Sequence, residues 1–156
     1  FLPELLEASE AAQALCDLAE SRLLQRGEAL RCRGTVVMAT VEGDLHDLGK
    51  KVVAMVLKSR GYRIVDLGVD VPAQAILEAA RREEADVVGL SALMTTTGEA
   101  MKTVIARGRR LDLGCRFIVG GAAVSSAFAL DAGADGYAPD AVEAARLVDR
   151  LMAERT

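Results

Sequence analysis

The chain has 156 residues, of which 51% are hydrophobic and only 3% aromatic, and it carries a formal net charge of −4. Its length and composition fit one globular domain with an aliphatic core. The acidic charge balance argues against a nucleic-acid groove or a polybasic membrane face, so we expect neither nucleic acid nor a membrane as a partner.

The cysteines and the N-terminal residues bear on the cellular compartment. Cys16, Cys32 and Cys115 are widely spaced and form no CxxC pair, which argues against a disulfide framework or a zinc site. Glu4 and Glu7 lie where a secretory leader would be basic. No apolar stretch approaches the length of about 18 residues that a membrane-spanning helix needs. We therefore expect a cytoplasmic protein.

The first thirty residues have a helical pattern. Leu5, Ala12 and Leu15 recur at helical spacing in an Ala/Leu/Glu-rich segment, and Gly27 is a natural break. One or two helices of this length do not bury their own apolar stripe, so they must pack against something else. Two interpretations stay open: the helices dock on the main domain, or they belong to a larger helical unit of which only this part is present.

From Arg33 onward, apolar runs rich in β-branched residues alternate with amphipathic segments. The apolar runs predict strands over 35–40, 62–67, 86–91, 116–119 and 136–138. The amphipathic segments predict helices over 49–60, 72–84, 98–110, 123–132 and 140–152. The last helix begins with Asp140 and Glu143 at the spacing of a capping box.

The first predicted helix of this part has a clear apolar face, formed by Val52, Val53, Val56 and Leu57. We expect its basic residues to point away from that face; they are Lys50, Lys51, Lys58 and Arg60. Strands that are continuous apolar runs and alternate with helices predict a parallel sheet covered on both faces. Five β-α units in about 120 residues fit a flavodoxin-like, doubly wound α/β domain with strand order 2-1-3-4-5. We expect residues 33–156 to form this Rossmann-like domain.

In such a fold, ligands bind beyond the carboxyl ends of the strands, at the switch point between the first and third strands. The segments that emerge there are 41–49, 91–98, 120–123 and 137–140. The first segment carries the only histidine, His46, with Asp44 and Asp47 beside it. A lone imidazole flanked by carboxylates is typical of a metal ligand whose tautomer a neighbouring residue holds. Small and hydroxyl residues dominate the other segments and leave room for a bulky, elongated ligand.

Structural explanations compete with the functional one. The pair Gly120 and Gly121 is consistent with a tight turn, and 95–97 is consistent with a cap on the next helix. A P-loop is excluded, because five residues separate Gly43 from Gly49 where the Walker motif has four.

Two further site types also compete. A divalent-cation site formed by Asp44, His46 and Asp47 stays open, but Asp140 is the only carboxylate at the other strand ends and it has a capping position. A phospho-acceptor domain needs an aspartate at the end of the third strand, where this chain has Ser91, so we exclude it.

Three motifs in order, each at the end of a predicted strand, carry a resemblance to a known family. Asp44-x-His46-x-x-Gly49, then Ser91-x-Leu93 and Gly120-Gly121, resemble the signature of cobalamin (vitamin B12)-binding domains. The resemblance covers roughly residues 33–152. Segments 41–50, 65–72, 91–97 and 134–141 are closer still to the small corrinoid proteins of methanol, methylamine or methoxyaromatic methyltransferase systems, which are siblings of the methionine synthase cobalamin domain.

The resemblance also concerns the N-terminal helices. Residues 2–6 look like the last part of the helical cap that covers the methyl face in these corrinoid proteins. We therefore expect residues 1–32 to be the remnant of an N-terminal helical cap, followed by the cobalamin-binding domain over 33–156.

The resemblance implies a cofactor and a set of binding residues. The cofactor is cobalamin or a related corrinoid with its lower base displaced, present as methylcobalamin in the loaded state, and His46 is the lower cobalt ligand. Asp44 accepts the other imidazole N–H, and Ser91 hydrogen-bonds Asp44, so these three residues form the reactive chain. The implied cofactor-binding residues are Gly43, Asp44, Leu45, His46, Asp47, Leu48, Gly49, Ser91, Leu93, Thr95, Gly120, Gly121, Ala122, Tyr137 and Ala138.

The resemblance further implies a methyl carrier rather than an enzyme that is catalytic alone. Its partners are a substrate methyltransferase and an acceptor methyltransferase that uses tetrahydrofolate or a thiol, with a reductive activator as a further partner. Two alternatives share the histidine motif. One is the cobalamin domain of an adenosylcobalamin mutase, which works with a barrel not present in this sequence. The other is a B12-dependent sensor that regulates DNA binding, which a light-dependent change in oligomeric state would reveal.

Overall fold

A computed structural model describes residues 32–154 together with Glu4, Glu7, Ala11 and Ala14. The predicted cap remnant over 1–32 therefore lies mostly outside the described residues. In the described part of the chain, no helix is long and apolar enough to cross a membrane.

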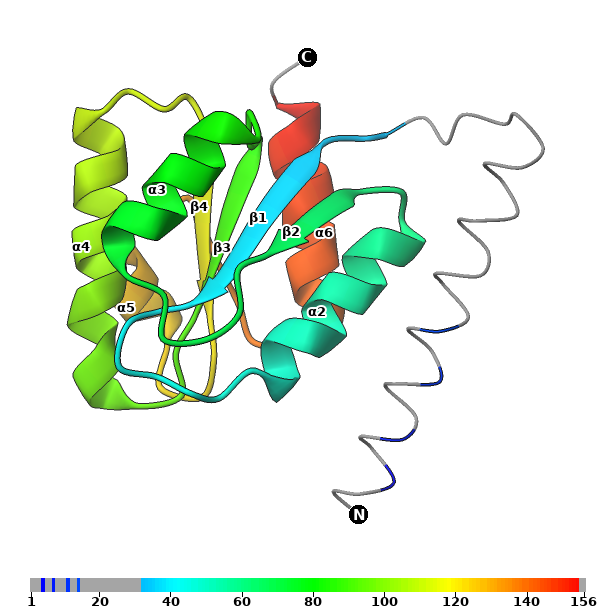
Figure 1. Cartoon of the computed structure of the whole chain (residues 1–156), viewed down its shortest axis with the longest axis horizontal. Helices are drawn as coiled ribbons and strands as arrows, with labels where there is room; N and C mark the ends of the chain where they lie inside the picture. The colour runs from blue at the N-terminus through cyan, green and yellow to red at the C-terminus, as the bar shows by residue number, and fades with distance from the viewer. Residues whose placement is uncertain (1–3, 5–6, 8–10, 12–13, 15–31, 155–156) are drawn as a thin grey trace.

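Five parallel strands form one sheet in the order β2-β1-β3-β4-β5. Figure 1 shows β2, β1, β3 and β4 side by side. The strands are β1 (Thr35–Thr40), β2 (Arg63–Asp66), β3 (Val87–Ser91), β4 (Arg116–Gly120) and β5 (Gly136–Ala138). The flavodoxin-like prediction is confirmed, and each strand bound lies within one residue of the predicted one. The continuous apolar runs identified these strands because both faces of the sheet are covered.

Helices cover both faces of the sheet. They are α2 (Leu48–Ser59), α3 (Ala73–Arg82), α4 (Gly98–Arg110), α5 (Ser126–Asp131) and α6 (Ala141–Ala153), with a single 3₁₀ turn, η1 (Thr95–Thr97), before α4. Helices α2 and α6 lie on one face, and α3, α4 and α5 lie on the other (Figure 1). The prediction of a helix over 123–132 is too long, because the Ser125 side chain accepts from the Phe128 N–H and starts α5 there.

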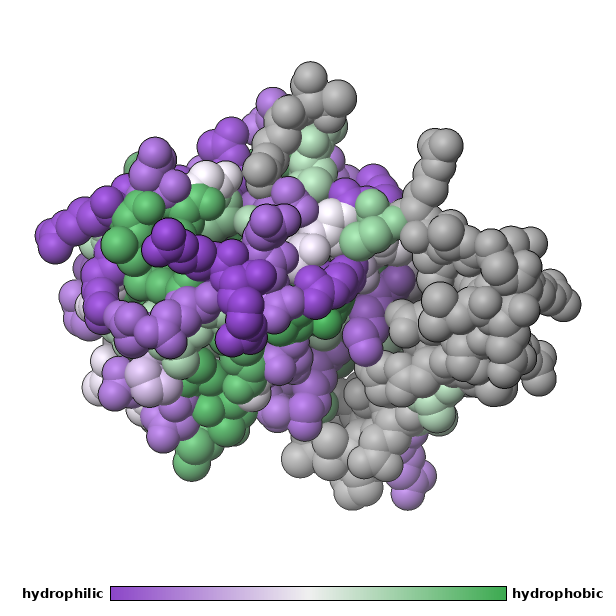
Figure 2. All heavy atoms as spheres, turned by 45° about the horizontal axis from the view of Figure 1, so that its top comes forward, coloured by the Kyte–Doolittle hydropathy of each residue, from purple (hydrophilic) through white to green (hydrophobic). Residues whose placement is uncertain are grey.

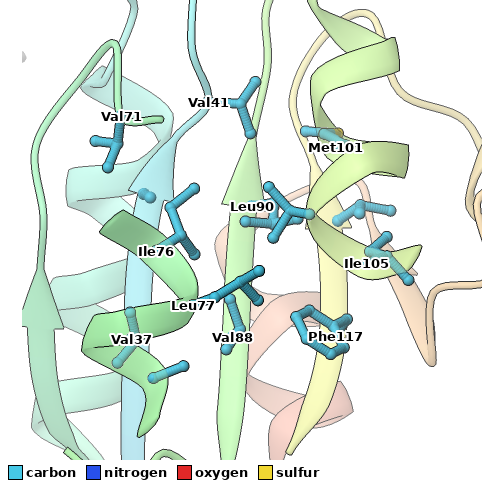
Figure 3. Close-up of a cluster of buried hydrophobic side chains, with 14 of the residues drawn as sticks. Val37, Val41, Val71, Ile76, Leu77, Val88, Leu90, Met101, Ile105 and Phe117 are labelled. Atoms are coloured by element: carbon cyan, nitrogen blue, oxygen red, sulfur yellow. The ribbon is translucent and has the colours of Figure 1, made fainter. Parts of the chain in front are cut away.

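An apolar cluster joins the sheet to α3 and α4 (Figure 3). Ile76 and Leu77 of α3 and Ile105 of α4 pack over Val88 and Phe117 of the sheet. The opposite face has its own cluster, formed by alternate strand residues and the apolar sides of α2 and α6; it includes Val36, Met38, Val87, Ile118, Leu57, Ala145, Leu147 and Val148. Successive strand residues point to opposite helical layers, so both layers are anchored by the same strands.

Lys50 departs from its prediction. The sequence predicts that it points away from the apolar face of the first helix, and this is wrong, because Lys50 is buried on the same side of α2 as Leu57. Its Nζ forms an ion pair with the Asp66 carboxylate and donates to the Gly68 carbonyl oxygen at 2.7 Å. A buried charge is tolerated when it is paired and hydrogen-bonded. The interaction ties the start of α2 to the loop that follows β2.

A polar network closes the end of the domain where the strands begin. The Asp149 carboxylate of α6 accepts from Arg60 Nη1 and from Tyr62 Oη, both at 2.6 Å, and it pairs with Arg33 at 3.0 Å. The Arg33 guanidinium also lies over the Tyr62 ring, 4.9 Å from its centroid. Figure 2 turns this end forward and shows that hydrophilic residues predominate there outside the grey atoms. The site described below lies at the opposite end.

Candidate functional site

The loop between β1 and α2 presents His46 at the carboxyl edge of the sheet. Thr40 Oγ1 donates to the His46 carbonyl oxygen at 3.1 Å, and the His46 N–H donates to Asp44 Oδ1 at 3.0 Å. The imidazole Nδ1 lies 2.8 Å from the same Asp44 oxygen, and 54% of the His46 side chain is exposed. Because a carboxylate only accepts, Nδ1 carries the proton and the lone pair of Nε2 is left for a ligand.

Asp44 itself is completely buried. Its second oxygen, Oδ2, accepts from the backbone N–H groups of Leu93 at 2.7 Å and Met94 at 3.2 Å. Burial raises the pKa of Asp44, but the hydrogen bonds from His46, Leu93 and Met94 outweigh burial and hold the pKa well below its usual range. Asp44 is therefore an ionised carboxylate that joins the loop after β1 to the loop after β3.

The hydroxyl beside Asp44 belongs to Thr97. Thr97 Oγ1 lies 3.0 Å from Asp44 Oδ2 and 2.7 Å from the Met94 carbonyl oxygen, so its single proton is shared between two acceptors. The expected Ser91–Asp44 hydrogen bond does not occur in the part of the chain that the structure describes; Ser91 ends β3 and lines the neighbouring crevice. Thr97 is the last residue of η1, and this turn places its hydroxyl within hydrogen-bond distance of Asp44. Thr97 occupies the N-cap position of α4, as the structural explanation predicts, but its side chain makes no capping hydrogen bond there.

A crevice of about 920 Å³ opens next to His46, between α2 and α6. The part of its floor nearest the carboxyl ends of the strands is formed by three small residues, which lie side by side on β3, β4 and β5. They are Ser91, Gly120 and Ala138. The sequence-predicted residues that line it are Leu45, His46, Asp47, Leu48, Gly49, Ser91, Leu93, Gly120, Gly121, Ala122, Tyr137 and Ala138.

Three predicted residues do not line the crevice. Asp44 lies behind the imidazole, as its hydrogen bonds to His46 require. Gly43 is exposed, and its N–H donates to the Asp70 carboxylate at 2.7 Å. Thr95 is exposed at the first position of η1.

The crevice continues deeper than the sequence indicated. Its inner lining includes Met38, Gly89 and Ile118 from the sheet, together with Val52 and Val53 from α2. Met38 and Ile118 also belong to the core cluster under α2 and α6, so the hydrophobic pattern of these strands alone does not show that the crevice reaches them.

The loop after β2 supports the histidine loop. The Asp70 N–H donates to the Asp44 carbonyl oxygen at 2.9 Å, while the Asp70 carboxylate accepts from the Gly43 N–H. Asp70 has a φ of +52°, in the left-handed region that few residues other than glycine adopt. The sequence did not predict these two hydrogen bonds of Asp70, although an aspartate before Val71-Pro72 is a turn-forming signal.

The donor set limits the kind of metal site that can form. In the residues that the structure describes, no three His, Cys, Asp or Glu side chains are grouped to hold a metal ion. The divalent-cation interpretation therefore fails: Asp44 is turned inward, and Asp47 pairs with Lys51 at 2.9 Å. A metal held here by His46 alone must bring its other ligands with it. The fold and site define a flavodoxin-like domain that presents one exposed imidazole beside a large, mainly apolar crevice.

Comparison with known proteins agrees with this class. A family model described as the B12 binding domain matches residues 34–146. The chain is 39% identical to dimethylamine corrinoid protein 1 of Methanosarcina acetivorans over 98% of this chain and 72% of that protein. It is 33% identical to a corrinoid protein of Desulfitobacterium hafniense over 97% of this chain and 72% of that protein. The methanol:cobalamin methyltransferase complex MtaBC from Methanosarcina barkeri contains a chain that aligns with a TM-score of 0.82 and 33% identity, over 98% of this chain and 58% of that chain.

The chain therefore belongs to the B12-binding domain family. Its cofactor is cobalamin or a related corrinoid, and the predicted family and cofactor are confirmed. The residues fit such a group, because an accessible imidazole with its Nδ1 occupied stands at the mouth of a large crevice lined by small side chains.

Proposed function

We propose that this chain is a corrinoid methyl carrier, with His46 as the lower ligand of the cobalt and the corrinoid's own lower base displaced. The observation that carries the proposal is the His46 imidazole, which is 54% exposed beside the crevice while the buried Asp44 holds its Nδ1. When bound, the corrinoid supplies a metal that accepts a methyl group and gives it up again. A 39% identical dimethylamine corrinoid protein supports this role.

The residues of the chain orient and tune the ligand. Asp44 accepts a hydrogen bond from the Nδ1–H group of His46. This hydrogen bond fixes the orientation of the ring and makes Nε2 a stronger metal ligand. Nε2 would ligate the metal of the bound corrinoid, and the Asp44 carboxylate holds the imidazole in place through Nδ1. The Thr97 hydroxyl, which lies between the Asp44 carboxylate and the Met94 carbonyl oxygen, completes the set of donors around that carboxylate.

Apolar side chains at the mouth form a surface for the corrin ring. Leu45 of the histidine loop is 70% exposed, and Leu93 and Met94 of the loop after β3 are 43% and 38% exposed. Exposed apolar groups of this kind mark a binding surface. We assign the crevice beyond them to the displaced nucleotide tail, where Gly120 and Ala138 allow the tail to approach the strand backbone closely.

The same proposal includes the partners and the cap. A substrate-specific methyltransferase loads the carrier, and an acceptor methyltransferase that uses tetrahydrofolate or a thiol unloads it, with a reductive activator restoring oxidised cofactor. The aligned chain of the MtaBC methyltransferase complex supports a methyltransferase partner. Residues 1–32 are the end of a helical cap over the methyl face, and the carrier works in the cytoplasm.

The first prediction tests His46 directly. In His46→Ala, the domain keeps its fold because the side chain is exposed, but reconstituted methylcobalamin lacks its lower nitrogen ligand. We expect a base-off absorption spectrum at neutral pH for the variant and a nitrogen-ligated spectrum for the wild type. Asp47→Asn is the matched control, since Asp47 lies next to His46 but pairs with Lys51.

Identical spectra for His46→Ala and the wild type would exclude His46 as the ligand. Preference for adenosylcobalamin over methylcobalamin would favour the mutase alternative, and light-dependent oligomerisation would favour a sensor.

A further inference from the structure

Asp70 has a backbone conformation that helix termination does not explain. Its φ is +52°, in the left-handed region that costs free energy in a residue with a side chain. Among the described residues other than glycine, two more have a positive φ, Glu84 and Asp112. Each of those lies one residue beyond the C-cap of a helix, α3 or α4, where a left-handed residue commonly ends the helix. Asp70 lies in the loop after a strand, so its conformation needs another reason.

The loop after β2 is held in place without the side chain of Asp70. The Gly68 N–H donates to the Asp66 carboxylate at 2.9 Å and forms the turn. The Gly68 carbonyl oxygen accepts from the Thr40 N–H at 3.0 Å, and the Thr40 carbonyl oxygen accepts from the Val71 N–H at 3.1 Å. These backbone hydrogen bonds join the loop to the end of β1 on both sides of Asp70. Asp70 itself is exposed, so it adds little burial to the loop.

The polar groups of Asp70 hold the segment before His46 instead. The Asp70 carboxylate accepts from the Gly43 N–H at 2.7 Å, and the Asp70 N–H donates to the Asp44 carbonyl oxygen at 2.9 Å. One residue thus binds both ends of the Gly43-Asp44 dipeptide. Gly43 has a φ of +85° and the conformational freedom of a glycine, so this dipeptide could rotate if it were not held. Because Asp44 Oδ1 lies 2.8 Å from His46 Nδ1, such a rotation would move the imidazole.

The position restricts the residue types that can do this. Aspartate and asparagine adopt the left-handed conformation more readily than other residues that carry a side chain. The side chain must also be short and end in an acceptor, since the Gly43 N–H lies 2.7 Å from Asp70 Oδ1. Asparagine meets both requirements, whereas glycine meets only the first.

We propose that Asp70 is a positioning residue for the metal ligand: its carboxylate and its N–H hold Asp44, and through Asp44 they hold the His46 imidazole ready to ligate cobalt. The inference rests on the proposed function, in which His46 is the lower ligand. Asp70 acts through Asp44 and does not itself contact the cofactor. Groups that orient a metal ligand in this way commonly change metal affinity by about 10-fold or more when they are removed.

The test uses methylcobinamide, a corrinoid without the nucleotide tail and its base, so that a nitrogen-ligated absorption spectrum must come from the protein. Asp70→Gly and Asp70→Asn are compared with the wild type. Equilibrium dialysis measures affinity, and circular dichroism measures the thermal stability of the ligand-free proteins. Glu84→Gly is the matched control, since it removes the same left-handed strain at the end of α3.

We expect Asp70→Gly to bind methylcobinamide about 10-fold more weakly and to lose most of the nitrogen-ligated spectrum, because Gly43 has lost its acceptor. Asp70→Asn should stay within about 2-fold of the wild type, because it keeps the acceptor and the left-handed conformation. Glu84→Gly should bind as the wild type does. The ligand-free Asp70→Gly should melt within about 4 °C of the wild type, because the lost hydrogen bond is exposed.

A double-variant cycle separates positioning from a general effect on the fold. If Asp70 acts through the imidazole, Asp70→Gly costs no further affinity in a His46→Ala background. An equal loss of affinity in both backgrounds would overturn the inference.

The remaining outcomes separate this inference from the proposed function. A wild type that does not bind methylcobinamide, or that has the same bound spectrum as His46→Ala, overturns the proposed function and this inference with it. A nitrogen-ligated wild type overturns the positioning role alone if Asp70→Gly is unchanged, or if Asp70→Asn binds as weakly as Asp70→Gly. A ligand-free Asp70→Gly that is unfolded would assign Asp70 to the fold and would also overturn the inference.

Discussion

Five donors converge on the Asp44 carboxylate, and they come from two loops far apart in the chain. Oδ1 accepts from the His46 N–H and Nδ1, and Oδ2 accepts from Leu93, Met94 and Thr97. A buried carboxylate is stable only when its oxygens are satisfied in this way. Asp44 thus has two roles at once: it sets the orientation of His46 and it holds the loop after β3 against the loop after β1.

The residue-scale prediction distinguishes the two candidate hydroxyls. Thr97→Val keeps the shape of the side chain but removes one donor from a buried carboxylate, and we expect it to lower the free energy of unfolding by about 1–2 kcal/mol. Ser91→Ala is the control, because Ser91 lines the crevice and does not contact Asp44. Its expected loss is under about 0.5 kcal/mol. Urea denaturation of the ligand-free proteins measures both, and a larger loss in Ser91→Ala would contradict the assignment.

At the scale of elements, the loop after β2 holds the histidine loop in place through hydrogen bonds. Lys50, at the start of α2, binds Asp66 at the end of β2 and Gly68 in the loop that follows. Asp70, further along it, is hydrogen-bonded to Gly43 and Asp44. The position of His46 therefore depends on a helix start and a strand end as well as on its own motif.

The element-scale prediction concerns this support. Lys50→Met keeps the aliphatic stem but removes the Nζ donor, so that the Gly68 carbonyl keeps only the Thr40 N–H and the Asp66 carboxylate only the Gly68 N–H. We expect a loss of about 2 kcal/mol in the free energy of unfolding. Hydrogen exchange at the Asp70 amide should also accelerate, because that amide belongs to the supported loop. Lys51→Met is the control, since Lys51 is 56% exposed and its helical ion pair contributes little. Equal losses in the two variants would refute the role of Lys50.

At the scale of the whole molecule, the two ends of the domain have different roles. The carboxyl ends of the strands carry the proposed cofactor site, and the other end is held together by the network of Arg33, Arg60, Tyr62 and Asp149. Burial, followed by the hydrogen bond to Asp149 and its charge, raises the pKa of Tyr62 to about 12. Neutral Tyr62 is thus preferred in the folded state.

The whole-molecule prediction is a loss of stability in alkali. Because the folded-state pKa of Tyr62 lies above its unfolded value of about 10, its contribution is complete below pH 10 and disappears as the pH rises through about 12. We expect this loss to be about 2 kcal/mol in the wild type and absent in Tyr62→Phe, measured by urea unfolding across that range.

The ionisation itself can be followed in a chain with one tyrosine. The sequence has two tyrosines and no tryptophan, so Tyr137→Phe leaves Tyr62 as the only source of tyrosinate absorbance. Since the network and the crevice lie at opposite ends, Tyr62→Phe should leave corrinoid affinity unchanged. Tyrosinate that forms near pH 10 in folded Tyr137→Phe would contradict the raised pKa.

Local sequence patterns were sufficient to predict the α/β order, the strand bounds and the place of the histidine motif, because these follow from periodicity and from the rule that parallel strands end at one edge. Asp140 as a helix cap was equally local, and its side chain accepts from the Glu143 N–H at 2.9 Å. Tertiary structure alone decided that Thr97 rather than Ser91 meets Asp44, that Lys50 is buried, and that Gly89 faces open space. Each of these depends on how loops and helices far apart in sequence come to lie over one another: Thr97 and Asp44 are 53 positions apart and meet only because a 3₁₀ turn folds back. Hydrophobic pattern specifies which face of a strand is buried, but not whether a helix or a cofactor fills the space above it.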